Sequence, residues 1–302
     1  MTQLSDTEQR NTNSEAIDHL ASTEIVRLMN AEDATIAGAV ATQQDQIAAA
    51  IDVITDRIRA GGRLIYFGAG TSGRLGVLDA SECPPTFSTP PEMVVGLIAG
   101  GHAALTRAIE GAEDLPESAV DDLRQIELSS RDVVVGIATS GRTPYVIGGL
   151  QYAQQLGAYA IGLACTRNSQ LEPNADLMIV PVVGPEVVTG STRLKAGTAT
   201  KMVLNMLTTG AMVRLGKTYG NLMVDLTATN QKLHERSCRI VSEVTGLSGE
   251  EAQRVLEECD GQLKVAIVAT LLKVSPGEAR NRLHSAGGHL REAIRPAQEP
   301  GT

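Results

Sequence analysis

A tetrapeptide, Thr-Ser-Gly-Arg, occurs twice in this chain, each time directly after an apolar run. The first copy, residues 71–74, follows the run at 64–67 and a glycine-rich turn, and the second, residues 139–142, follows the run at 133–138. Short apolar runs rich in valine and isoleucine are typical of parallel strands covered on both faces. Two strand–turn–helix units of this kind predict an α/β fold with a parallel sheet of flavodoxin or Rossmann type.

Both turns have the chemistry of an anion-binding site. Glycine lets the backbone approach a ligand, hydroxyl groups donate hydrogen bonds, and the start of a helix offers free N–H groups. Serine and threonine also cap ordinary helices, but the repetition of the tetrapeptide favours a ligand. We therefore predict a phosphate site at the carboxyl edge of the sheet. The residues expected to form it are Thr71, Ser72, Gly73, Ser140, Gly141, Arg142 and Thr143.

The first turn also fits a dinucleotide fingerprint, since Gly68, Gly70 and Gly73 have the spacing GxGxxG. That fingerprint needs an acidic residue at the end of the second strand to hold a ribose hydroxyl. The second predicted strand, 93–98, instead ends in Ile-Ala-Gly-Gly. A nucleotide is therefore disfavoured, and we expect no cofactor.

Composition narrows the classes of partner. The formal net charge of −9 disfavours nucleic acid, whose binders usually carry a basic face. The four cysteines are scattered without a CxxC pair, so neither a metal site nor a disulfide framework is expected. No apolar run reaches the length of a membrane span, and the polar first residues do not read as a signal peptide. We expect a cytoplasmic protein.

The hydrophobic pattern divides the chain into four parts. We predict an N-terminal helical arm at 1–45, a ligand-binding α/β domain at 46–220, a long connecting helix at 221–246, and a small three-helix bundle with a tail at 247–302. Residues 1–13 are polar and are expected to be frayed. Helices are predicted at 33–60, 72–81, 102–110 and 225–245, among others.

Longer runs carry a resemblance to a known family. The segments 70–76 and 79–86, the latter reading Asp-Ala-Ser-Glu-Cys-Pro-Pro-Thr, are similar to the N-acetylmuramic acid 6-phosphate etherase family. The segments 110–114, 140–145, 188–198 and 220–225 continue the similarity, which spans nearly the whole chain. The resemblance implies a sugar isomerase (SIS) fold, and the animal glucokinase regulatory protein is a more distant relative.

The resemblance also implies an activity. A member of this family would cleave the D-lactyl ether at C3 of a phosphorylated amino sugar, giving N-acetylglucosamine 6-phosphate and D-lactate. It would act as a homodimer, without metal or cofactor. Two alternatives from other classes stay open: a non-catalytic phosphosugar-binding regulatory protein, and a hexosamine-phosphate isomerase that abstracts the C2 proton but releases no lactate.

Elimination of an ether needs an acid and a base in opposite protonation states. The resemblance assigns Glu82 as the acid that protonates the leaving lactate and Glu113 as the base at C2. Solvated carboxylates at helix ends are the structural alternative for both. Five further residues are possible substrate contacts: Glu186, Ser191, Arg193, Lys195 and, from the partner subunit of a dimer, His234. Arg193 or Lys195 would suit the lactyl carboxylate, and a salt bridge at the helix start is the alternative.

Overall fold

The computed structural model describes residues 4–226 and 231–295. The chain divides into two compact units. The first comprises residues 1–81 and 91–209, and the second residues 82–90 and 210–302. The C-terminal tail predicted after the bundle lies outside the described residues.

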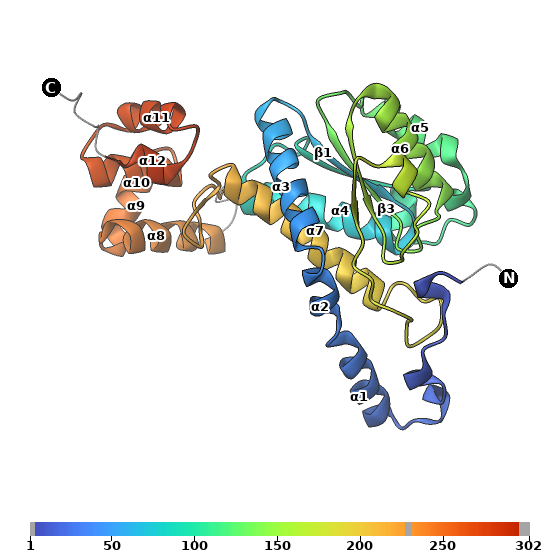
Figure 1. Ribbon diagram of the computed structural model, residues 1–302. Helices are drawn as coiled ribbons and strands as arrows, with labels where there is room; N and C mark the ends of the chain where they lie inside the picture. Colours follow the sequence, from blue (N-terminus) through green and yellow to red (C-terminus); the bar gives the residue numbers. More distant parts are fainter. Residues whose placement is uncertain (1–3, 227–230, 296–302) are drawn as a thin grey trace. The chain divides into compact units, whose positions relative to one another are not determined.

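The first unit is built on a parallel sheet with the strand order β2-β1-β3-β4-β5 (Figure 1). Its strands are β1 (Leu64–Gly68), β2 (Val94–Ile98), β3 (Val133–Ile137), β4 (Tyr159–Leu163) and β5 (Leu177–Ile179). All the pairings are parallel, and every residue of β1 and β3 is buried. The predicted α/β fold with a parallel sheet is therefore confirmed.

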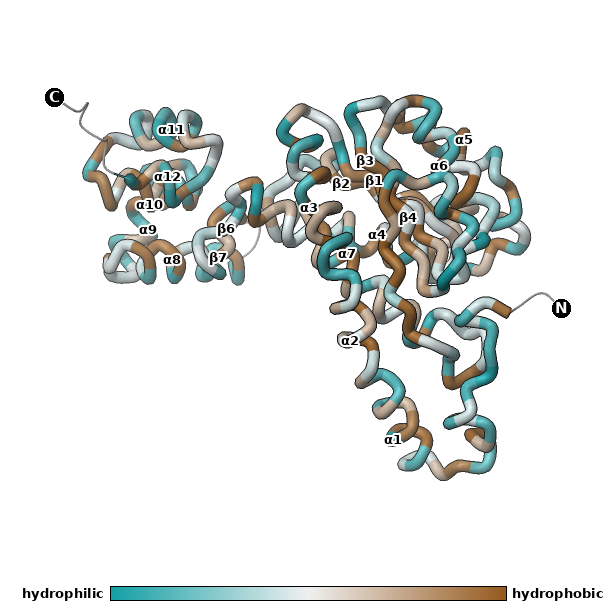
Figure 2. The backbone as a smooth tube through the Cα atoms, viewed as in Figure 1, coloured by the Kyte–Doolittle hydropathy of each residue, from teal (hydrophilic) through white to brown (hydrophobic). Residues whose placement is uncertain are grey.

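The helices of the first unit are α1 (Ser22–Asp33), α2 (Ile36–Ala41), α3 (Gln44–Arg59), α4 (Gly70–Phe87), α5 (Pro116–Gln125), α6 (Pro144–Leu156) and α7 (Lys195–Arg214), of which α4 and α7 continue into the second unit. Helices α3 and α6 pack against strands of the sheet. One core layer packs α5 and α6 onto the sheet, and in it the rings of Phe67 and Tyr145 lie 6.2 Å apart. Figure 2 shows the hydrophobic residues concentrated along the strands.

The second unit is helical apart from one short hairpin. Its elements are β6 (Thr218–Tyr219), β7 (Leu222–Met223), α8 (Gln231–Thr245), α9 (Gly249–Glu258), α10 (Leu263–Leu272), α11 (Pro276–Ser285) and α12 (Leu290–Ala293). Ser248 and Glu251 form a capping box at the start of α9. Ile240 and Val241 of α8 are buried in the core that α9, α10 and α11 share. The small helical bundle is thus present, with α8 packed into it.

The helix predicted at 33–60 is broken into three pieces. The Thr35 hydroxyl donates to the Glu32 carbonyl at 2.8 Å, and the Thr42 hydroxyl donates to the Ala39 carbonyl at 2.7 Å. Each bond uses a carbonyl that would serve the helix ladder, which explains why segments end there. Periodicity of apolar residues continues across both breaks, so the pattern alone could not reveal them.

Helix α4 extends past the end predicted at residue 81, through Pro84 and Pro85, to Phe87. Proline disfavours helical geometry in the residue before it, so the prediction placed the end too early. Burial of Cys83 and Phe87 favours the longer helix, and the Ser88 N–H donates to the Pro84 carbonyl at 2.9 Å, which completes the last turn. Glu82 therefore lies within the helix rather than near its end.

Two more expectations are corrected. The helix predicted at 225–245 begins only at Gln231 in the described residues, after the β6–β7 hairpin, and Asp225 lies outside any helix. The N-terminal segment is anchored at Asp6 rather than frayed, because the Asp6 carboxylate accepts a hydrogen bond from the Arg167 guanidinium at 2.6 Å and the Asp6 N–H donates to the Thr166 hydroxyl at 3.0 Å. Among the described helices, none combines the length and apolarity needed to cross a membrane.

Candidate functional site

The two predicted loops lie at the switch point of the sheet. Strands β1 and β3 are neighbours in the sheet. From β1 the chain continues to β2 on one side, and from β3 it continues to β4 on the other side, so the two connections run in opposite directions. Gly68 pairs in register with Ile137, which brings both strands to their carboxyl ends at the same level. Ligands of open α/β sheets bind at this position. The sheet therefore places the two Thr-Ser-Gly-Arg turns side by side.

The first loop is shaped by close backbone packing. A Cβ on Gly73 would lie 2.5 Å from the Gly68 carbonyl oxygen, so only glycine fits where α4 starts against β1. Arg74 donates from Nε to the Leu105 carbonyl and from Nη2 to the Arg107 carbonyl, each at 3.0 Å. Arg74 thus braces a neighbouring loop. The same two bonds show why the helix predicted at 102–110 stops as a 3-10 turn at Leu105.

The second loop is hydrogen bonded to the segment that follows β4. Gly141 has φ +71°, and a Cβ there would lie 2.8 Å from Ser169 Oγ. The Ser169 hydroxyl and the Gln170 N–H both donate to the Gly141 carbonyl, at 3.1 Å and 2.8 Å. Thr143 occupies the N-cap of α6 without a side-chain capping bond. The helix-cap explanation therefore does not account for its hydroxyl.

A third turn, 186–194, precedes α7. Glu186 is fully buried and accepts hydrogen bonds from the N–H groups of Lys195 and Ala196, each at 2.9 Å. Burial raises the pKa of the Glu186 carboxyl, although these bonds oppose the rise. Lys195 pairs with Glu32 at 2.6 Å, with its side chain only 4% exposed. Both residues are engaged at the helix start, while Arg193 is exposed and Ser191 is half-buried.

Three contacts draw these segments together. A Cβ on Gly197 would lie 3.6 Å from the Thr71 Cγ2, so the start of α7 adjoins the first loop. Glu8 Oε1 accepts a hydrogen bond from Arg142 Nη2 at 3.1 Å, and Glu8 Oε2 lies 3.4 Å from the position of a Cβ on Gly190. Glu8 therefore joins the second loop to the third turn. Sequence analysis missed it because the N-terminal segment shows no motif.

The two predicted catalytic carboxylates are both exposed. Glu113 lies in a 3-10 turn, Ala112–Asp114, that follows Gly111 in a left-handed conformation and packs against α6. Because α6 starts at the second loop, this packing ties the Glu113 turn to that loop. Glu82 lies on α4, the helix that starts at the first loop, and belongs to the second unit. Each carboxylate is thus carried by an element that is connected to one of the loops.

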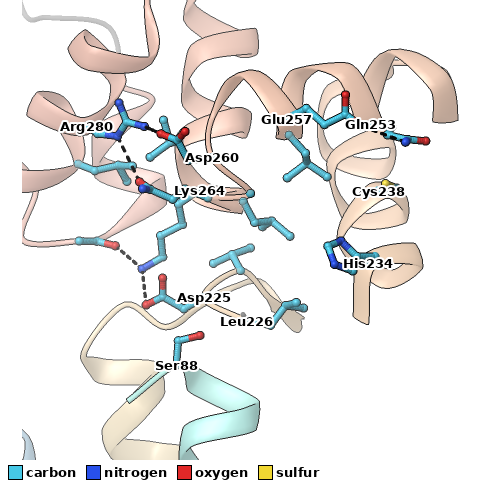
Figure 3. Close-up of a pocket in the computed structure, with 18 of the residues that line it drawn as sticks. Ser88, Asp225, Leu226, His234, Cys238, Gln253, Glu257, Asp260, Lys264 and Arg280 are labelled. Carbon is cyan, nitrogen blue, oxygen red and sulfur yellow. Dashed lines mark hydrogen bonds and ion pairs between the residues drawn. The ribbon is translucent and has the colours of Figure 1, made fainter. Parts of the chain in front are cut away.

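A large groove of about 1620 Å³ lies within the second unit, lined by His234 on α8 among others (Figure 3). Its charges are largely paired with each other. Asp225 binds Lys264 at 3.0 Å and Lys217 at 2.8 Å, and Asp260 binds Arg280 at 2.5 Å. Lys264 also donates to a backbone carbonyl. No group of three or more His, Cys, Asp or Glu side chains in residues 4–226 and 231–295 could hold a metal ion.

The sequence matches three domain families. Residues 46–154 match the glucokinase regulatory protein N-terminal SIS domain, residues 117–210 match the SIS domain, and residues 220–259 match the C-terminal lid domain of glucokinase regulatory protein. Among solved structures, a phosphoheptose isomerase from Francisella tularensis is similar with a TM-score of 0.52 and 16% identity, covering 64% of this chain and 100% of that one. This likeness shows the fold.

Two named relatives match over nearly their whole length. An N-acetylmuramic acid 6-phosphate etherase from Rhodopirellula baltica is 65% identical, covering 94% of each chain. One from Brucella anthropi is 58% identical, covering 95% of this chain and 94% of its own. With the SIS sheet and both loops in place, this identity decides the family: the chain belongs to the N-acetylmuramic acid 6-phosphate etherases.

Proposed function

We propose that this chain cleaves the D-lactyl ether at C3 of N-acetylmuramic acid 6-phosphate, giving N-acetylglucosamine 6-phosphate and D-lactate. The observation that carries this is the identity of 65% to a named etherase over 94% of both chains. The two loops at the switch point of a SIS sheet supply a place for the phosphate.

The chemistry runs through the open-chain sugar, whose aldehyde at C1 makes the proton on C2 acidic. Glu113 takes that proton, the C2–C3 double bond forms, and the C3–O bond breaks with its electron pair moving to the lactyl oxygen. Glu82 protonates that oxygen, and D-lactate leaves. Water then adds at C3 and a proton returns to C2, which yields the product sugar and restores both carboxyl groups.

The phosphate is assigned to the second loop. Ser140 and Thr143 would donate from their hydroxyls, and Gly141 and Arg142 from their N–H groups. Two observations support this assignment. The Thr143 hydroxyl does not cap α6, and the left-handed backbone at Gly141 is held by the hydrogen bond from the Ser169 hydroxyl to the Gly141 carbonyl. Thr71, Ser72 and Gly73 of the first loop would hold sugar hydroxyls or the remaining phosphate oxygen.

The remaining substrate contacts are assigned to side chains that are not already paired within the protein. Lys195 is paired with Glu32, so the exposed Arg193 is the better partner for the lactyl carboxylate. Glu186 caps α7, and Ser191 completes the turn that leads to it. We also propose a cytoplasmic homodimer in which the exposed His234 reaches the site of the partner subunit.

The decisive experiment follows two products at once. Wild type and Glu82→Ala are incubated with N-acetylmuramic acid 6-phosphate in deuterated water, and lactate release and C2 deuteration are measured together. We expect lactate from wild type, and C2 deuteration without lactate from the variant. A wild type that binds phosphosugar but releases no lactate would overturn the proposed activity and favour the regulatory or isomerase alternatives.

A further inference from the structure

Two of the contacts between α5 and α6, both helices of the first unit, involve residues close in sequence to the predicted site. Tyr145, the second residue of α6, is fully buried, and its hydroxyl donates to Asp122 Oδ2 of α5 at 2.6 Å. Further along α6, a Cβ on Gly148 would lie 2.5 Å from the carbonyl oxygen of Pro116. The two helices are thus joined by a hydrogen bond and by a close backbone approach that requires glycine.

Each of these helices starts next to one part of the proposed site. Helix α6 follows the second loop directly, so Tyr145 is two residues from Thr143. Helix α5 begins at Pro116, and two residues separate Pro116 from Glu113 in the preceding 3-10 turn. The packing of α5 on α6 therefore determines where the proposed base lies relative to the proposed phosphate loop.

The surroundings of Tyr145 hold its hydroxyl at this one partner. Its ring lies in the core that α5 and α6 share with the sheet, and the ring centre is 6.2 Å from that of Phe67 on β1. A Cβ on Gly149 would overlap the Phe67 ring, so glycine lets α6 approach the strand closely. A buried hydroxyl needs a hydrogen-bond partner. Burial and the nearby Asp122 carboxylate both raise the pKa of Tyr145, so the hydroxyl keeps its proton and donates it.

We propose that the hydrogen bond from Tyr145 to Asp122 positions Glu113 relative to the second loop, which makes both partners positioning residues for removal of the C2 proton. This inference rests on the proposed function, in which Glu113 is the base. The bond fixes α5 against α6, and the Glu113 turn itself packs against α6. Proton removal is sensitive to such placement, since a displacement of about 1 Å can slow a reaction about 100-fold.

Three variants change this bond, and a fourth serves as control. Tyr145→Phe keeps the ring but removes the donor, and Asp122→Leu removes the acceptor. In Asp122→Asn the amide oxygen can still accept from Tyr145, so the bond is kept without the charge. Tyr152→Phe is the matched control. Tyr152 lies seven residues further along α6, and the Arg124 guanidinium of α5 lies 5.3 Å from its ring centre, a contact that phenylalanine retains.

The experiment measures catalysis and binding on the same samples. Each variant is incubated with N-acetylmuramic acid 6-phosphate in deuterated water, and C2 deuteration and lactate release are followed. Calorimetry with N-acetylglucosamine 6-phosphate gives the affinity and the stoichiometry, which reports the fraction of folded sites.

We expect Tyr145→Phe and Asp122→Leu to lower kcat for both products about tenfold, because proton removal comes first. Their affinity should stay within about twofold of wild type, because the hydrogen bond from Ser169 to Gly141 still holds the second loop. Asp122→Asn should keep kcat within about threefold, and Tyr152→Phe should match wild type. The double variant Tyr145→Phe/Asp122→Leu should be no slower than either single variant, since both changes remove the same bond.

Three outcomes would overturn the positioning role. The first is a kcat that falls only in proportion to the stoichiometry, since the pair would then act on folding alone. The second is an equal loss of kcat and affinity, which would place the effect on the loop rather than on Glu113. The third is full additivity in the double variant. A wild type that neither deuterates C2 nor releases lactate would instead overturn the proposed function itself.

Discussion

The Glu8 carboxylate accepts a hydrogen bond from the Arg142 guanidinium at 3.1 Å, so an acidic side chain from the N-terminal segment lies on the loop assigned to the phosphate. The two side chains are 31% and 58% exposed. Asp6, two residues earlier, is anchored on Arg167 and fixes this segment in place. A phosphate that engages the Arg142 side chain must therefore displace a carboxylate that is held close by.

Removing this competition should strengthen phosphosugar binding. Glu8→Gln keeps the size of the side chain but removes its charge, and we expect KM for the 6-phosphosugar to fall about two- to fivefold, the range of an exposed ion pair. Glu15→Gln, an exposed carboxylate of the same segment, is the control and should leave KM unchanged. A rise in KM for Glu8→Gln would show instead that Glu8 aligns Arg142 for binding.

The second loop can be probed at one hydroxyl. Ser140→Ala should weaken binding of a 6-phosphosugar about tenfold or more, the effect of losing one hydrogen bond to a charged group. Binding is measured by calorimetry with N-acetylglucosamine 6-phosphate and compared with Ser130→Ala. Ser130 precedes β3 at the opposite edge of the sheet, so its variant should bind as wild type does. Unchanged affinity in Ser140→Ala would remove this hydroxyl from the cradle.

Backbone strain and side-chain collision can be separated at two glycines. Gly141 and Gly184 have nearly equal φ angles, +71° and +70°. A Cβ on Gly141 would meet Ser169 and Thr166, whereas a Cβ on Gly184 has nothing within 4 Å. Both alanine variants should lose about 1–2 kcal/mol of stability to the left-handed conformation. Only Gly141→Ala should also weaken phosphosugar binding, by about tenfold or more, because the loop must shift. Equal affinities in the two variants would contradict this.

Much of the fold and the loops could be predicted because local patterns determine them. The apolar runs predict β1 and β3, and the repeated tetrapeptide predicts the two loops that the register of Gly68 and Ile137 places together. The helix predicted at 102–110 failed because a side chain bonds backbone groups far away in the sequence. Arg74 binds the carbonyls of Leu105 and Arg107, which an isolated helix would have used for itself. No local pattern contains such a contact.

The ion pairs and hydrogen bonds around the site could not be predicted from the sequence either. Lys195 was a candidate substrate contact, but its ammonium pairs with Glu32, which lies 163 residues away in the chain. Asp79 lies in the same run as Glu82, residues 79–86, yet only the structure shows that it is buried against Thr208. Residue type and spacing predict which chemistry is present, whereas burial decides which groups are free to perform it.

A buried ion pair at the opposite end of the sheet should govern stability in acid. Asp132 is 1% exposed and accepts hydrogen bonds from Arg63 and from the Ser129 N–H, each at 2.9 Å. Burial by itself raises its pKa, but these bonds outweigh it, so the pKa lies below the ordinary value. The Asp132 contribution is thus present above the unfolded pKa of about 4 and is lost as pH falls through the folded pKa.

We expect Asp132→Asn to lower the unfolding free energy by about 2 kcal/mol at about pH 7, because Arg63 then lacks its counter-ion in a largely buried place. The deficit should shrink as the pH falls below about 4, where wild type also loses the charge. Asp121→Asn is the matched control, since Asp121 pairs with Arg124 with both side chains exposed, and it should change stability by less than about 0.5 kcal/mol. Urea unfolding across this pH range measures the unfolding free energy of both variants. If the stability loss in Asp132→Asn stays the same in acid, packing rather than charge makes Asp132 important.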